Sequence, residues 1–253
     1  MKTLKLAAAL VLMAAPAFAQ TNDASVDPNR ITVQMMPGLT SSNQLPTERL
    51  INARKALAAG QSIYVSDMRA IADFGDGFAA YRFADWLAEN SDDPSYSDIA
   101  HYYGIAAATA RGGAIRQMIR ALDQVNPETL VRARSDVLEN ILFTYAKAGN
   151  ALAVEAVIRY DTAQRPFGRL GSEVATLLDH IDGENAVQVS LHLAAGILQN
   201  PQATQFDLDQ AQTYLDIAMS SQSLESRLVA SNLAPLLDEA SIKLTSASTE
   251  TSQ

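Results

Sequence analysis

A glycine that recurs at a fixed spacing constrains this chain more than any other feature. Gly75, Gly112 and Gly149 follow one another at intervals of 37 residues. Each has a small residue three positions before it and a large apolar residue three positions after it. Glycine readily takes the left-handed conformation that ends one helix and lets the next begin antiparallel to it. A shifted fourth copy occurs at Gly183. Such a period is typical of stacked helix pairs.

A shift of 111 residues, or three periods, gives a second indication of the same repeat. It superposes Tyr103 on Tyr214 without a gap. The flanking alanines also coincide, and their spacing places them with the tyrosine on one helical face. Small residues on that face let a partner helix approach closely, while the tyrosine fills the space beside them. The other coincident pairs are Ala84 and Ala195, Leu87 and Leu198, Asp98 and Asp209, Ala100 and Ala211, and Ala107 and Ala218.

The pattern predicts an all-α fold: an α-solenoid of about five to six antiparallel helix hairpins, with a repeat period of about 37 residues. Segments between 47 and 243 are rich in Ala, Leu, Ile and Met at helical spacing, and none alternates as a strand would. We expect Asn126 to cap the sixth helix, with Pro127 in its first turn. The expected helices are 48–59, 66–74, 77–89, 98–111, 114–125, 128–148, 150–160, 172–181, 184–199, 208–220 and 224–242.

Residues 1–19 have the pattern of a signal peptide. Lys2 and Lys5 flank the start of a short apolar run, and Ala17-Phe18-Ala19 is a small-x-small cleavage site. The apolar run is too short to span a bilayer. We therefore expect cleavage after Ala19, a periplasmic or secreted protein, and no transmembrane segment in the mature chain. The alternative is a retained N-terminal anchor helix.

Two further segments flank the predicted helical-repeat domain at 47–243. Residues 20–46 contain several turn-forming pairs and no sustained periodicity, which predicts a flexible leader. Residues 244–253 are small and polar, which predicts a disordered tail.

Part of the repeat resembles a known family. Ala100-x-x-Tyr103-x-x-x-Ala107-Ala108 followed by Gly112 is similar to the second helix and closing glycine of Sel-one-like repeats, which are relatives of the tetratricopeptide repeat. The resemblance covers roughly residues 66–241. It implies a right-handed superhelix that binds other proteins on its concave surface and carries no catalytic residues. Exported bacterial members are often regulators or scaffolds in envelope and exopolysaccharide systems.

The composition narrows the range of functions that this chain can have. The chain has no cysteine, so disulfides, thiolate metal sites and a cysteine nucleophile are excluded. Its 28 acidic residues exceed its 19 basic ones, which argues against nucleic-acid binding. No catalytic or cofactor-binding motif is present, and we expect no cofactor and no metal. The alternative for residues 179–184, which bunch three carboxylates with a histidine, is a weak divalent-cation site.

Two features indicate a partner-binding surface. Eight aromatic residues lie in 74–103, and Trp86 and Tyr102 combine an apolar body with a polar tip suited to a partner. Residues 111–169 carry nine basic and six acidic side chains between acidic flanks. Arg116 and Arg120 are four residues apart and so project from one side of a helix. Because arginine captures carboxylates well, an acidic peptide or an anionic glycan would suit this region.

The leading hypothesis is a non-enzymatic exported scaffold or regulator that mediates protein–protein interaction. The alternative is a module that binds polysaccharide or peptidoglycan strands in envelope or exopolysaccharide biogenesis. A third hypothesis is a hydrolase on a helical scaffold, because paired carboxylates need proximity in space and not in sequence.

Overall fold

The computed structural model describes residues 31–250, with side chains described as far as Leu244. The predicted signal peptide at 1–19, the first part of the predicted leader at 20–30 and residues 251–253 lie outside the described residues. Within 31–250 the chain forms helices and no strand, which confirms the all-α class. The α-helices of this part are α1 (Glu48–Ala58), α2 (Val65–Asp73), α3 (Gly77–Glu89), α4 (Tyr96–Ala108), α5 (Gly113–Leu122), α6 (Arg132–Lys147), α7 (Ala151–Ala163), α8 (Gly171–Ala175), α9 (Gly183–Leu198), α10 (Gln205–Met219) and α11 (Leu224–Glu250).

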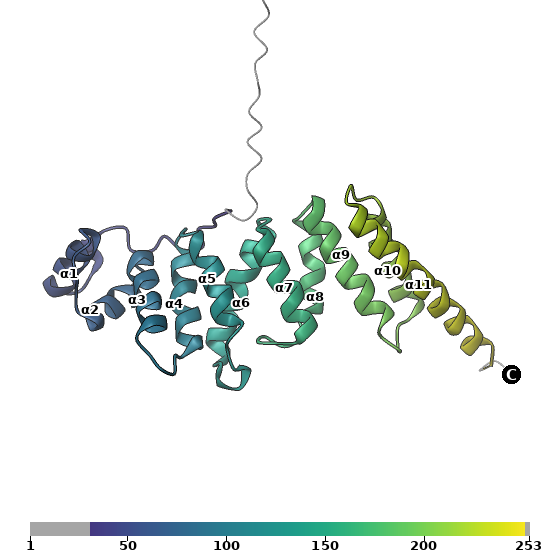
Figure 1. Ribbon diagram of the computed structural model, residues 1–253, viewed down its shortest axis with the longest axis horizontal. Helices are drawn as coiled ribbons and strands as arrows, with labels where there is room; N and C mark the ends of the chain where they lie inside the picture. Colours follow the sequence, from purple (N-terminus) through teal and green to yellow (C-terminus); the bar gives the residue numbers. More distant parts are fainter. Residues whose placement is uncertain (1–30, 251–253) are drawn as a thin grey trace, which may run out of the picture.

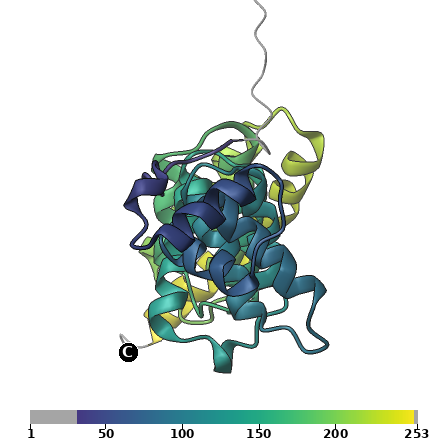
Figure 2. The same ribbon diagram turned by 90° about the vertical axis from the view of Figure 1, so that its left-hand side faces the viewer.

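The helices follow one another in a row. Each packs mainly against the one or two helices that come next in the sequence. Figure 1 shows this row running from α1 to α11, and Figure 2 looks along it from the α1 end. A large apolar cluster is built from α1 to α8 with part of α9, and a smaller one from α9 to α11. Helix α9 therefore joins the two clusters.

At two of the three evenly spaced positions, glycine has the left-handed conformation that the sequence predicts. Gly75 follows α2 and Gly149 follows α6, each with a φ of +84°. In each turn the next residue donates its backbone N–H to a carbonyl five positions back, from Asp76 to Ile71 and from Asn150 to Tyr145. This bond closes the end of a helix around a left-handed residue.

The middle turn differs from the prediction. Gly112 has a φ of −55°, and the left-handed residue is Ala110, with a φ of +67°. The reason is that α4 ends at Ala108, and the closing bond runs from the Arg111 N–H to the Ala106 carbonyl. The expectation that Gly112 supplies the left-handed conformation is wrong. Gly183 has a φ of +55° and is the first residue of α9.

Most observed helix boundaries lie within three residues of the expected ones, and α6, α8 and α11 are the exceptions. Asn126 caps a short 3-10 helix, η3 (Pro127–Thr129), and not α6. The chain is then extended at Leu130 and Val131, which packs Leu130 against the core before α6 begins. Helix α8 is shorter than expected because the chain tightens into the 3-10 helix η4 (Thr176–Asp179).

The structure corrects the prediction of a flexible leader for residues 31–46. These residues lie against the helices, and a short 3-10 helix, η2 (Ser42–Gln44), leads to Leu45, which is buried. Three apolar side chains of residues 31–39 also pack on the core: Val33, Met35 and Leu39. Burial of apolar surface offsets the entropy that a flexible segment would keep.

At the other end, the predicted disordered tail overlaps α11, which continues to Glu250. After Pro235 no glycine or proline interrupts α11, and each further residue of a formed helix adds a hydrogen bond. Among the described residues, no helix is both long enough and apolar enough to cross a membrane.

Candidate functional site

The two aromatic residues predicted to contact a partner lie in different environments. Trp86 of α3 is 36% exposed, and its ring stacks on Phe83 with centroids 6.1 Å apart. Tyr102 of α4 is only 5% exposed, and its hydroxyl donates a 2.9 Å hydrogen bond to Asp73 Oδ1. Burial, together with this bond, raises the pKa of Tyr102. The prediction that Tyr102 contacts a partner is therefore wrong, because its side chain belongs to the core.

Arg116 and Arg120 are exposed on α5, as their spacing indicates. Neither forms an ion pair within residues 31–250, and Arg120 donates a 3.4 Å hydrogen bond to Oε1 of Gln117. The same holds for most of the basic stretch at 111–169. Of its nine basic residues, only Arg134 and Arg159 pair with carboxylates inside the described chain, namely Asp98 and Asp123.

The residues 31–39 form an extended segment that crosses the ends of several helices along one edge of the row (Figure 1). The backbone N–H groups of Met35 and Met36 both donate to the Ala108 carbonyl, at 2.8 and 3.1 Å. The Leu39 N–H donates to the Gly75 carbonyl at 3.1 Å. Carbonyls at helix ends lack partners within their own helix, so the segment supplies donors where the helices need them.

The evenly spaced glycines face this extended segment. A Cβ on Gly112 would lie 2.0 Å from Cγ2 of Thr32, so a side chain there would force Thr32 to move. A Cβ on Gly149 would lie 3.7 Å from Cδ1 of Ile31, and one on Gly75 would lie 3.9 Å from the Cα of Gly38. The 37-residue spacing thus lines up a row of turns along which an extended chain lies closely.

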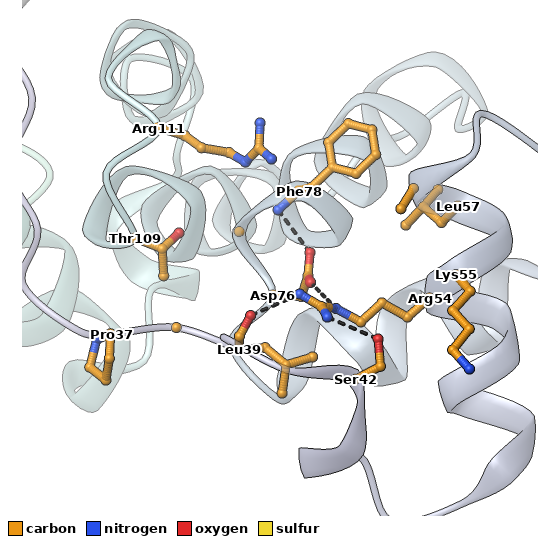
Figure 3. Close-up of a pocket in the computed structure, with 13 residues that line it drawn as sticks. Pro37, Leu39, Ser42, Arg54, Lys55, Leu57, Asp76, Phe78, Thr109 and Arg111 are labelled. Atoms are coloured by element: carbon orange, nitrogen blue, oxygen red, sulfur yellow. Dashed lines mark hydrogen bonds and ion pairs between the residues drawn. The ribbon is translucent and has the colours of Figure 1, made fainter.

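Arg54 of α1 ties the segment to the helices, as Figure 3 shows. Its Nε donates to Oδ2 of Asp76 at 2.7 Å, and its terminal nitrogens donate to Ser42 Oγ and to the Leu39 carbonyl. The other carboxylate oxygen of Asp76 accepts from the N–H groups of Phe78 and Ala79 and so caps α3. Asp76 therefore has both oxygens satisfied.

A cavity of about 390 Å³ opens beside this contact. Arg111 lies over the ring of Phe78 on one wall, with its guanidinium carbon 4.8 Å from the ring centroid (Figure 3). Lys55 lines the cavity from α1. Neither Arg111 nor Lys55 forms an ion pair in the described part of the chain. The cavity is therefore positively charged and suited to an anionic group.

A second cavity, of about 840 Å³, lies where the two apolar clusters meet. It is lined by α7, α8, α9 and α10. His192 Nε2 and Asp161 Oδ2 are 2.8 Å apart across this junction, and Asp161 Oδ1 accepts from the Leu170 N–H. Tyr214 lines the cavity from α10, and burial raises the pKa of its hydroxyl.

Neither cavity is lined by Trp86, Arg116 or Arg120. Sequence reasoning missed both cavities because they join residues far apart in the chain. Arg54 and Asp76 are 22 positions apart, and Asp161 and His192 are 31 apart. One signal was present for the extended segment: Ile31, Val33 and Met35 alternate with polar residues, as in a half-buried extended chain.

Among residues 31–250, no three or more histidine, aspartate or glutamate side chains are grouped to hold a metal ion. In the acidic turn at 179–184, the Glu184 carboxylate accepts hydrogen bonds from the hydroxyls of Ser221 and Ser226. No family model, curated protein or solved structure matches this chain.

Proposed function

We propose that this protein is an exported, non-enzymatic scaffold that binds an acidic segment of a protein partner. In this proposal the row of helices is an α-solenoid of five to six hairpins of the Sel-one-like type. Residues 1–19 direct export, and the mature chain works in the periplasm or outside the cell.

The observation that carries the proposal is the unpaired basic stretch in the middle of the row. Seven of the nine basic residues at 111–169 form no ion pair within the described chain. Exposed arginines remain available for bidentate bonds to carboxylates of a partner.

The extended 31–39 segment supports the same function in another way. Its Met35, Met36 and Leu39 N–H groups bond to carbonyls at the helix ends, and a partner chain could use the same kind of main-chain bond along this edge. The helix row also leaves large apolar side chains exposed, among them Trp86 at 36% and Phe206 at 68%. Exposed aromatic side chains are frequent anchors of protein interfaces.

Affinity capture with the mature chain tests the proposal. We expect at least one envelope protein to bind the wild type and to be lost with Arg116→Glu/Arg120→Glu, because the reversed charges repel a carboxylate. Arg82→Glu is the matched control, since it reverses an exposed charge on α3, outside the basic stretch. Recovery of the same proteins with all three forms would contradict the proposal, as would recovery of acidic glycans alone.

Export is tested separately. The intact mass of the protein purified from the periplasm or medium should correspond to a chain that begins at Gln20. A full-length mass in a membrane fraction would indicate the retained N-terminal anchor instead.

A further inference from the structure

The cavity lined by α7 to α10 contains two positions at which a repeated hairpin differs from its earlier copy. The shift of 111 residues places α3 and α4 on α9 and α10. The packing agrees, because Ala100, Ala107 and their counterparts Ala211 and Ala218 are all fully buried. Both hairpins therefore bring their helices together on the same face.

In the first hairpin, formed by α3 and α4, a carboxylate accepts a hydrogen bond from the tyrosine hydroxyl. The hydroxyl of Tyr103 donates a 2.7 Å hydrogen bond to Asp85 Oδ1, and its ring meets Tyr81 edge-on at 5.4 Å. The side chain of Tyr103 is 6% exposed. Asp85 and Tyr81 thus close the space beside the tyrosine.

In the later hairpin both closing residues are replaced. The shift puts Gly196 where Asp85 stands and His192 where Tyr81 stands. Gly196, His192 and Tyr214 all line the cavity of about 840 Å³. The Tyr214 hydroxyl makes no hydrogen bond within the described residues, and a Cβ built on Gly196 meets nothing within 4 Å. The later hairpin therefore keeps the tyrosine hydroxyl and the space beside it, but it has no carboxylate in the position of Asp85.

The lining of this cavity contains two carboxylates, Asp161 and Asp207, and one guanidinium, that of Arg169. Both oxygens of Asp161 are used, by His192 and by the Leu170 N–H. Oδ2 of Asp207 accepts two bonds from Thr204, which lower the pKa of Asp207 and form the capping box of α10. Two lining groups that have no partner in the described chain are donors, namely the Tyr214 hydroxyl and the Arg169 guanidinium.

We propose that this cavity binds a glutamate or aspartate side chain of the partner, whose carboxylate takes the place that Asp85 holds beside Tyr103. Tyr214 donates to the carboxylate, as Tyr103 does to Asp85, and Arg169 neutralises its charge. Arg169 is the last basic residue of the stretch at 111–169, which links this cavity to the proposed function. The inference rests on the proposed function and names one specific site for it.

The test is a titration of the ¹⁵N-labelled mature chain with N-acetyl-glutamate methylamide, followed by NMR. We expect saturable shifts at the Gly196 amide, and binding about fivefold or more weaker for the neutral glutamine analogue. Tyr214→Phe should weaken binding by a similar factor because the donor is lost. Gly196→Asp should abolish it, since the new carboxylate fills the site from within. Gly196→Ala is the matched control and should bind as the wild type does.

Absence of saturable shifts at Gly196, or equal binding by Gly196→Asp and Gly196→Ala, would overturn the proposal. Saturation by methyl galacturonide with no response to the glutamate probe would also overturn it, in favour of a glycan site. Because the titration needs no partner, a negative result alongside successful affinity capture removes this site and leaves the proposed function standing. Circular dichroism of each variant confirms that the helices are retained.

Discussion

Arg54 and Asp76 form a 2.7 Å ion pair that joins α1, the start of α3 and the extended 31–39 segment. Both side chains are largely buried, with 23% and 8% exposed. Arg54→Leu leaves the Asp76 carboxylate without its charge partner and the Leu39 carbonyl without its donor. We expect a loss of about 2–3 kcal/mol in the free energy of unfolding, measured in urea.

Arg82→Leu is the control for this variant, since Arg82 is exposed on α3 and forms no ion pair in the described chain. It should unfold at the same urea concentration as the wild type. Hydrogen exchange adds a local readout: the Met35 and Leu39 amides should exchange faster in Arg54→Leu. Unchanged exchange there would mean that Arg54 does not hold the segment.

Gly112 and Gly113 offer a matched pair for the packing of the extended segment. A Cβ on Gly112 would lie 2.0 Å from Thr32 Cγ2, whereas one on Gly113 meets nothing within 4 Å. Gly112→Ala should therefore cost about 1–3 kcal/mol of unfolding free energy. Gly113→Ala should be neutral or stabilise by up to about 1 kcal/mol, since alanine favours the helix that begins there.

Thr32→Ser removes the very atom that clashes and so provides a rescue. The double variant Thr32→Ser/Gly112→Ala should recover most of the stability lost by Gly112→Ala. Equal stability of the Gly112→Ala and Gly113→Ala proteins would show that residues 31–39 do not lie against this turn in solution.

Ala110 holds a left-handed conformation with a φ of +67°. That conformation costs an alanine about 1–2 kcal/mol. Glycine avoids this cost but loses about 0.5–1 kcal/mol through the greater freedom of the unfolded chain. Ala110→Gly should thus raise the unfolding free energy by roughly 0.5–1 kcal/mol. A lowered urea midpoint would place the left-handed turn elsewhere.

Three buried tyrosines predict a loss of stability at alkaline pH. Burial and hydrogen bonds to carboxylates raise the pKa of Tyr102, Tyr103 and Tyr160 above the ordinary value of about 10. The unfolded chain therefore releases these protons first. Stability is full below about pH 10 and falls as the pH rises towards the folded-state values, by up to about 1.4 kcal/mol per pH unit for each tyrosine.

Urea unfolding at a series of alkaline pH values measures this slope. Tyr103→Phe and Tyr160→Phe should each make it shallower, because each removes one titrating group. The exposed Tyr64, which is 80% exposed, supplies the control, and Tyr64→Phe should leave the slope unchanged. A slope that no core substitution alters would contradict the role of these hydroxyls.

The helical order could be predicted well from the sequence because it depends on local patterns. Apolar spacing placed α3 at its observed bounds, and Gly75 and Gly149 marked their turns correctly. Glycine has two reasons to be present at a turn, however. At Gly112 the reason is the lack of space beside Thr32, and a single sequence does not distinguish this from a positive φ.

The features of the candidate site were harder to predict because they depend on contacts between residues that are far apart in the sequence. Tyr102 has the composition of an interface residue, but Asp73 and Phe83 enclose it in the core. The extended segment follows the helices because Ala108 and Gly75 offer it carbonyls and because its apolar side chains pack on the core. Neither fact is visible in the local sequence around these residues.

The central claim is that the unpaired basic stretch recognises acidic protein segments. It is tested most directly by probing an array of random-sequence peptides with the labelled mature chain. The bound peptides should be enriched in glutamate and aspartate relative to the array, and Arg116→Glu/Arg120→Glu should remove this enrichment. Bound peptides with the average charge of the array, or the same selection by both proteins, would contradict the claim.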